Sequence, residues 1–246
     1  MSTIIPNWNS PSNVKAFSST RVGGFSKDEY RGLNLGTHVG DDINLVQKNR
    51  KYLQCQEDMP SAPVWLNQTH STHVVEVLKP TLEVLDADGA FSMSPGVVCS
   101  AMTADCLPVL LTNTSGTQVA AVHAGWRGLA GGIIENAIAK FKEHDPQSEI
   151  MAWLGPAIGP SVFEVGSDVV QAFVDFDSNA KAAFQTKPEQ DKWLANMSQL
   201  ARQRLNLAGV TEISDSNLCT YSDPDLFYSY RRDGVTGRQA TFIWMT

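Results

Sequence analysis

The alternation of apolar and polar positions along the chain predicts short strands near the N-terminus and a strongly apolar centre. Short runs rich in β-branched residues and bounded by turn residues are typical of strands. The central runs are expected to be buried strands, because each is short, apolar and bounded by Gly, Pro, Asn or Asp. The predicted strands cover residues 14–18, 63–66, 73–78, 96–102, 107–112, 118–122 and 150–154.

Apolar residues recur at helical spacing in several other segments. The predicted helix that ends near Gln56 has an aspartate at its start, a residue type that caps helix N-termini. The predicted helix over 129–142 directly follows the glycine-containing sequence 124–128, so the order there is strand, glycine loop and helix. The predicted helices run from Asp41 or Asp42 to about Gln56 and cover residues 129–142, 167–176 and 190–207.

The C-terminal region predicts a β-hairpin, with strands over 225–231 and 238–244 and a turn at 233–237. Strands and helices mix without strict βαβ alternation, which favours an α+β or mixed α/β fold over a doubly wound parallel sheet. No internal repeat or linker divides the chain, so a single domain over residues 1–246 is expected.

Composition narrows the possible functions. The chain carries 19 Lys and Arg against 26 Asp and Glu, a net charge of −7, so binding of nucleic acid through a basic surface is not expected. No apolar run approaches the roughly 18 residues of a membrane span, and no secretory leader is visible, so we expect a cytoplasmic protein without a membrane partner. The four cysteines form no Cys-x-x-Cys pair and are expected to be free thiols.

Three potential metal ligands lie beside predicted strand ends: His70, Cys106 and His123. A catalytic zinc ion takes three protein ligands from His, Cys or carboxylate and leaves a fourth position to water. Spacing alone is weak evidence for a metal site and favours a buried cysteine with two hydrogen-bonded surface histidines.

Other polar residues could bind substrate or move protons. Asp105 could orient a ligand histidine, take a proton, or cap a strand end. Arg127, beside a glycine turn at a helix start, would suit phosphate because backbone N–H groups and a guanidinium converge there. Arg21 and Arg232 are weaker candidates of the same kind, and one arginine of the pair at 231–232 could instead form a salt bridge to the aspartate that follows.

Eight short motifs, in order along nearly the whole chain, closely resemble the bacterial YfiH/YlmD family. They are 19–24 (STRVGG), 33–36 (LNLG), 38–41 (HVGD), 68–70 (QTH), 103–108 (TADCLP), 123–128 (HAGWRG), 155–160 (GPAIGP) and 228–233 (YSYRRD). The family was long labelled multicopper polyphenol oxidoreductase or laccase, and its members are now described as purine nucleoside phosphorylases with adenosine deaminase and methylthioadenosine phosphorylase activity. The resemblance implies an α/β/β/α sandwich fold.

The resemblance also implies site residues. The family's zinc ligands fall on His70, Cys106 and His123, with one zinc ion expected per chain. Asp105, Cys106 and His123 are the expected catalytic residues. The first motif histidine is usually followed by Gly, whereas this chain has Ser71, which leaves His73 as an alternative ligand. The expected substrate- and phosphate-binding residues are Arg21, Asn34, Gln68, Arg127 and Arg232.

We therefore expect zinc-dependent phosphorolysis of purine nucleosides, with some adenosine deamination, by a monomer or weak homodimer. Copper is less favoured, because several copper ions prefer imidazole ligands and the chain has only five scattered histidines. The strongest alternative is a metal-free hydrolase or amidase, acting for example on cell-wall peptide precursors, with Cys106 as nucleophile and His123 as base. Metal content separates the two hypotheses, because a zinc-bound thiolate is a poor free nucleophile.

Overall fold

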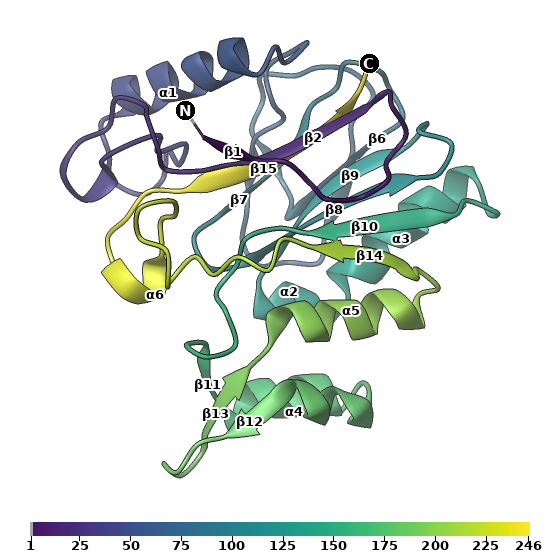
Figure 1. Ribbon diagram of the computed structural model, residues 1–246. Coiled ribbons are helices and arrows are strands. Elements are labelled where there is room, and N and C mark those ends of the chain that lie inside the picture. Colours follow the sequence, from purple (N-terminus) through teal and green to yellow (C-terminus); the bar gives the residue numbers. More distant parts are fainter. Residues whose placement is uncertain (1) are drawn as a thin grey trace.

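The computed structural model describes residues 2–246, in which two sheets pack face to face and helices cover their outer faces (Figure 1). Helix α1 (Ile43–Gln56) covers a four-stranded sheet, and helices α2 (Trp126–Gly131), α3 (Ile133–His144) and α5 (Met197–Leu207) cover a six-stranded sheet. This arrangement confirms the mixed α/β fold and the α/β/β/α layering.

The four-stranded sheet is antiparallel and has the order β1-β2-β15-β7. Its C-terminal strand β15 is an inner strand, hydrogen-bonded on both sides. The strands are β1 (Thr3–Ile4), β2 (Val14–Ser19), β15 (Gln239–Met245) and β7 (Cys99–Thr103).

The six-stranded sheet has the order β14-β10-β8-β9-β6-β4. Its inner pairs are antiparallel and its two edge pairs are parallel. The strands are β14 (Glu212–Asp215), β10 (Ile150–Leu154), β8 (Leu107–Asn113), β9 (Val119–Ala124), β6 (Gly89–Ser92) and β4 (Val74–Glu76). This mixed sheet confirms the prediction that the fold is not a doubly wound parallel sheet.

Smaller elements complete the chain. A three-stranded antiparallel sheet, seen beside α4 at the bottom of Figure 1, has the order β11-β13-β12, and β3 pairs with β5. The bounds are β3 (Leu66–Asn67), β5 (Leu85–Asp86), β11 (Glu164–Gly166), α4 (Ser167–Val174), β12 (Phe184–Thr186), β13 (Lys192–Ala195), α6 (Tyr230–Asp233) and the 3₁₀ helices Asp28–Tyr30 and Ser178–Ala183.

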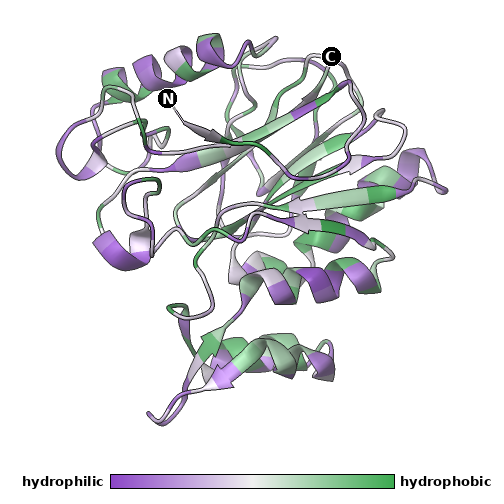
Figure 2. Cartoon of the chain, in the orientation of Figure 1, coloured by the Kyte–Doolittle hydropathy of each residue, from purple (hydrophilic) through white to green (hydrophobic). Residues whose placement is uncertain are grey.

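The central strands are buried on both faces. Leu110, Ala121 and Trp153 of the six-stranded sheet meet Ile243 of the four-stranded sheet in the core between the sheets. Figure 2 shows hydrophobic residues concentrated along these strands and hydrophilic residues on the outer turns of the helices. This double coverage explains why the central strands read as continuous apolar runs rather than as alternating ones.

Two helix predictions had the wrong bounds. The segment predicted as one helix over 129–142 contains two helices, because Gly132 has a φ of 100° and interrupts them. The segment predicted as a helix over 190–207 begins with strand β13, and α5 starts only after Asn196, whose side chain accepts a hydrogen bond from the backbone N–H of Gln199. The predicted helices ending near Gln56 and covering 167–176 are confirmed.

The predicted C-terminal hairpin is wrong. Strand β15 pairs with β2 and β7, and residues 225–231 form no strand. Tyr230–Asp233 is instead a short helix, because the side chain of Ser229 accepts from the backbone N–H of Arg232. Tertiary pairing thus overrides the local turn pattern. All four cysteines are free, and no helix within residues 2–246 is long and apolar enough to cross a membrane.

Candidate active site

The fold brings His70, Cys106 and His123 together. His70 follows β3, Cys106 directly precedes β8, and His123 lies in β9, the neighbour of β8. Their potential ligand atoms all lie within 4.8 Å of one another, and the Cys106 Sγ is 3.6 Å from the His70 Nε2. Gly125 permits this approach, because a Cβ at its position would lie 2.4 Å from the His70 ring and 3.3 Å from the Cys106 Sγ.

Asp88 holds two of these three residues in place. It is fully buried, and its carboxylate lies 2.8 Å from the His123 Nδ1. The same carboxylate accepts hydrogen bonds from the backbone N–H groups of Thr69, His70 and Ser71, and from the Ser71 hydroxyl. These bonds fix the loop in which His70 has a φ of 62°, a left-handed conformation that is unusual for a non-glycine residue.

Sequence reasoning missed Asp88. It lies 35 positions before His123 and belongs to no recognisable ligand spacing. Its only visible mark is a position immediately before the short strand β6, where many aspartates serve as caps or turns. Its function becomes evident only when β6 and β9 pair.

Asp88, Cys106 and His123 shift one another's pKa values, because His123 lies between the carboxylate and the thiol. Burial lowers the pKa of His123, but Cys106 and Asp88 outweigh this effect and raise it to about 9. Burial raises the pKa of Cys106, but His123 and His70 outweigh it and lower the value to about 6. Burial also opposes ionisation of Asp88, yet hydrogen bonds from His123 and Ser71 hold its pKa well below the usual range. In the metal-free protein, these shifts favour a Cys106 thiolate beside a His123 imidazolium at neutral pH.

A cavity of about 390 Å³ opens onto the three donors, which is within the size range of small-molecule sites. Gln68 is fixed in its wall, because its amide exchanges two 2.8 Å hydrogen bonds with the backbone of Met102. None of the lining residues is Asp or Glu. They are His38, Gln68, His70, Met102, Thr103, Ala104, Cys106, His123, Tyr230 and Arg238.

Asp105 lies next to Cys106 but does not line this cavity. One carboxylate oxygen accepts from the Thr220 hydroxyl and the other from the backbone N–H of Arg231, each at 2.7 Å. The side chain therefore joins the Cys106 loop to helix α6. A φ of 92° at Asp105 turns the chain between β7 and β8.

The predicted phosphate-binding arginines are not at the cavity. Arg127 is exposed on α2 and lies over the Trp126 ring. Arg21 donates to the carbonyls of Pro224 and Arg31 and does not line this cavity. Arg232 donates to three backbone carbonyls and forms the expected salt bridge to the aspartate that follows it.

Asn34 reaches the cavity only indirectly. It is fully buried, and its side-chain oxygen accepts from the backbone N–H groups of Gly36 and Arg238. Arg238 and Tyr230, which do line the cavity, were not among the predicted site residues. Arg238 lies in a segment that the sequence presents only as one arm of a hairpin, so no local pattern marks it.

The donor set fits a zinc ion. Two imidazoles and one thiolate are a mixed nitrogen and sulfur set of the kind that zinc binds, whereas a cluster of copper ions would need more imidazoles. The Nδ1 of His123 faces Asp88, so its Nε2 is available to a metal, and such a carboxylate–histidine pair is usual behind metal sites. His73 lies outside the donor group, with its Nδ1 2.9 Å from the Asp86 carbonyl oxygen.

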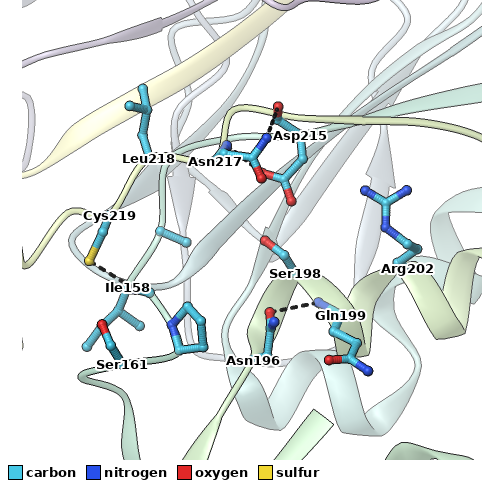
Figure 3. A pocket seen from close by; sticks show the side chains of 13 residues that line it. Ile158, Ser161, Asn196, Ser198, Gln199, Arg202, Asp215, Asn217, Leu218 and Cys219 are labelled. Carbon is cyan, nitrogen blue, oxygen red and sulfur yellow. Dashed lines mark hydrogen bonds between the residues drawn. The ribbon is translucent and has the colours of Figure 1, made fainter. Parts of the chain in front are cut away.

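A second cavity, of about 380 Å³, contains none of these donors. It lies between the loop 157–161, the first turns of α5 and the segment 215–219, and Figure 3 shows Arg202, Asp215 and Cys219 around it. The Cys219 Sγ accepts a hydrogen bond from the backbone N–H of Gly159 at 3.1 Å. No residue predicted from the sequence to act in the site lines this second cavity.

Fold and site together define a mixed α/β protein with a candidate His-Cys-His metal centre in a small-molecule cavity. The model of one family, described as multi-copper polyphenol oxidoreductase laccase, matches residues 15–246. The purine nucleoside phosphorylase YfiH of Escherichia coli (strain K12) is 50% identical over 242 residues, or 98% of each chain. The purine nucleoside phosphorylase of Haemophilus influenzae is 49% identical over 245 residues, or 99% of each chain.

Solved structures agree with this relationship. Protein NMB0706 of Neisseria meningitidis superposes with a TM-score of 0.92 at 45% identity, covering 100% of this chain and 99% of that one. The hypothetical protein YfiH of Bacillus licheniformis superposes with a TM-score of 0.88 at 29% identity, covering 95% and 93%. The chain therefore belongs to the family described as multi-copper polyphenol oxidoreductase laccase, and this confirms the resemblance of its motifs to YfiH and YlmD.

Proposed function

We propose that the chain is a zinc-dependent purine nucleoside phosphorylase. Its substrates would be adenosine, inosine, guanosine or methylthioadenosine with phosphate, and adenosine deamination would be a side activity. The observation that carries the proposal is the cavity in which His70, Cys106 and His123 place their ligand atoms within 4.8 Å of one another. The names of relatives about 50% identical over nearly the whole chain support the nucleoside substrate.

Phosphorolysis needs two kinds of group around the nucleoside. A phosphate oxygen attacks C1′ of the ribose while the bond from C1′ to the base breaks, and the base takes the electron pair and a proton. The transition state has a sugar cation, so an oxyanion must be held beside C1′ and a proton must reach the leaving base. Arg238 lines the cavity and can bind the anion.

His70, Cys106 and His123 would hold the zinc ion. When bound, zinc supplies a Lewis acid that activates water toward C6 of adenine, which accounts for deamination of adenosine to inosine. Asp88 would keep His123 in the tautomer that presents Nε2 to the metal. We propose zinc rather than copper, one ion per chain, because the group offers two imidazoles and one thiolate.

A second candidate function has its own support. In the metal-free protein, Cys106, His123 and Asp88 form a nucleophile, a base and an orienting carboxylate, and the pKa of the Cys106 thiol is lowered to about 6. This is the arrangement of a cysteine hydrolase or amidase. Such an enzyme would act without metal, for example on cell-wall peptide precursors.

The products of adenosine turnover test the proposal. Adenine and ribose 1-phosphate, formed only when phosphate is present, identify a phosphorylase, whereas inosine formed without phosphate identifies a deaminase. We expect phosphate-dependent adenine release with some inosine from zinc-loaded protein, and loss of both products in Cys106→Ser. Zinc-loaded protein that releases neither base nor inosine from any of the four nucleosides would overturn the proposal. Full activity after chelation would favour the metal-free alternative.

The predicted oligomeric state and location complete the proposal. We expect a monomer or weak homodimer, which size-exclusion chromatography with light scattering can measure. The protein is expected to act on small molecules in the cytoplasm. Neither nucleic acid nor a membrane is an expected partner, since the chain carries a net charge of −7.

A further inference from the structure

We propose that Arg238, with His38 and Tyr230 beside it, is the subsite that binds inorganic phosphate in this cavity, and that Arg127 is not. This inference rests on the proposed phosphorylase function and deepens it, because it assigns the second substrate to a particular wall. The sequence pointed to Arg127 at a helix start, but Arg238 is the only arginine among the cavity-lining residues within 2–246.

The backbone and stem of Arg238 are anchored. Its backbone N–H donates to the Asn34 side chain at 2.8 Å, directly before β15 begins. The stem packs against Gly36, where an added Cβ would lie 2.8 Å from the Arg238 Cγ. A side chain with a fixed stem loses little conformational entropy when it binds a ligand. The anchoring therefore preorganises the guanidinium.

The guanidinium itself retains free donors. Its Nη1 donates to the carbonyls of Thr236 and Gly237, at 3.1 and 2.9 Å. Within residues 2–246, neither Nε nor Nη2 of Arg238 has a hydrogen-bond partner and no carboxylate forms a salt bridge to it. By contrast, the guanidinium groups of Arg232 and Arg21 already donate hydrogen bonds to backbone carbonyls. Arg238 can therefore bind an oxyanion without breaking a salt bridge.

The charge around this wall favours an anion. No Asp or Glu lines the cavity, although acidic residues outnumber basic ones in the chain as a whole. His38 lies in the same wall, and its pKa is lowered by burial and by the positive charges of Arg238 and Arg50. Arg238 is half-buried, and burial lowers its pKa although the charges of Cys106 and Asp105 oppose this shift. Hydrogen bonds from a partly desolvated cation to an oxyanion are among the strong ones.

The position of this wall fits the reaction. The lining includes the three metal-ligand residues as well as Arg238, His38 and Tyr230, so a ligand in the 390 Å³ cavity can contact both groups of residues. The same cationic wall could also accept the 5′-phosphate of a nucleotide. We assign it to free phosphate, because phosphorolysis needs phosphate beside the sugar of a nucleoside that carries none.

Phosphate binding to zinc-loaded protein, measured by calorimetry, tests the assignment directly. We expect Arg238→Gln to weaken phosphate binding by about tenfold or more, because a bidentate charged donor is lost. Arg238→Lys should recover only part of the affinity, since a point charge cannot reproduce the fork of donors. Zinc content should match the wild type in both variants, because Arg238 is not one of the three potential ligand residues. Arg31→Gln, at an exposed arginine outside the cavity, is the matched control and should bind phosphate normally.

Steady-state kinetics provide the second measurement. Arg238→Gln should raise the KM for phosphate much more than the KM for the nucleoside. An effect on phosphate in Arg127→Gln but not in Arg238→Gln would overturn the assignment. So would wild-type protein that binds adenosine 5′-monophosphate but not inorganic phosphate.

The outcomes separate the subsite from the proposed function. If wild-type protein binds phosphate through Arg238 but releases no base from any nucleoside, the phosphorylase proposal fails and the phosphate subsite stands. If turnover requires phosphate but Arg238→Gln leaves both the affinity and the KM for phosphate unchanged, only the subsite fails.

Discussion

Replacing Asp88 by Asn tests whether one buried carboxylate supports the whole site. The substitution conserves volume but converts one carboxylate oxygen into an N–H₂ group. One oxygen accepts from the His70 backbone and faces the His123 Nδ1, and the other accepts from Thr69, the Ser71 backbone and the Ser71 hydroxyl. Whichever oxygen is replaced, two N–H donors face a group that cannot accept.

The magnitude follows from these contacts. A buried donor without an acceptor costs about 1–3 kcal/mol, so two of them predict a loss of about 2–6 kcal/mol in the free energy of unfolding. The loop that carries His70 has a φ of 62° and depends on the same carboxylate. We therefore expect zinc affinity to fall as well, by about tenfold to a hundredfold, as for other residues that orient metal ligands.

Urea denaturation and competition with a chelator measure the two effects separately. Asp86→Asn is the matched control, because Asp86 is exposed two positions away and, within residues 2–246, its carboxylate accepts a hydrogen bond only from Asn67. It should change the unfolding free energy by no more than about 0.5 kcal/mol. If Asp88→Asn unfolds at the same urea concentration as the control and retains zinc equally well, Asp88 is not the support of the site.

The pH dependence gives a further check on Asp88. Hydrogen bonds hold its pKa below the usual value despite burial, so its stabilising effect is complete above about pH 4 and is lost as the pH falls below that value. The difference in stability between wild type and Asp88→Asn should therefore shrink as the pH falls below about 4. A difference that grew in acid would contradict this linkage.

The remaining predictions concern the metal centre. Cys106→Ala should remove zinc, measured by metal analysis, and stoichiometric zinc in that variant would exclude Cys106 as a ligand. In metal-free protein, alkylation of Cys106 by iodoacetamide should rise through about pH 6 and then level off, while Cys99, whose pKa burial raises to about 12, should remain unmodified. Zinc should suppress this alkylation, and fast reaction in zinc-loaded protein would favour the hydrolase instead. Gly125→Ala should weaken zinc binding, because its Cβ would collide with the His70 ring at 2.4 Å, and unchanged affinity would show that the ring moves freely.

The sequence by itself determined the fold class and the three potential metal ligands. Apolar runs bounded by turn residues located the central strands to within a few residues, because burial on both faces leaves a local signature of continuous apolar character. His70, Cys106 and His123 could be chosen because the motifs around them resemble a known family, and the fold does bring them together.

Tertiary structure decided the rest, because the remaining features depend on contacts between residues far apart in the chain. The expected hairpin failed when β15 paired with β2 and β7, whose hydrogen bonds outweigh a local turn. Asp88 and Arg238 carry no local pattern and enter the site only through the pairing of β6 with β9 and the anchoring of the segment before β15. Arg127 shows the converse: its sequence context suits an anion, yet its side chain lies outside the cavity. Residue types and spacing describe neighbours along the chain, whereas a site depends on which side chains the packed sheets turn toward the same space.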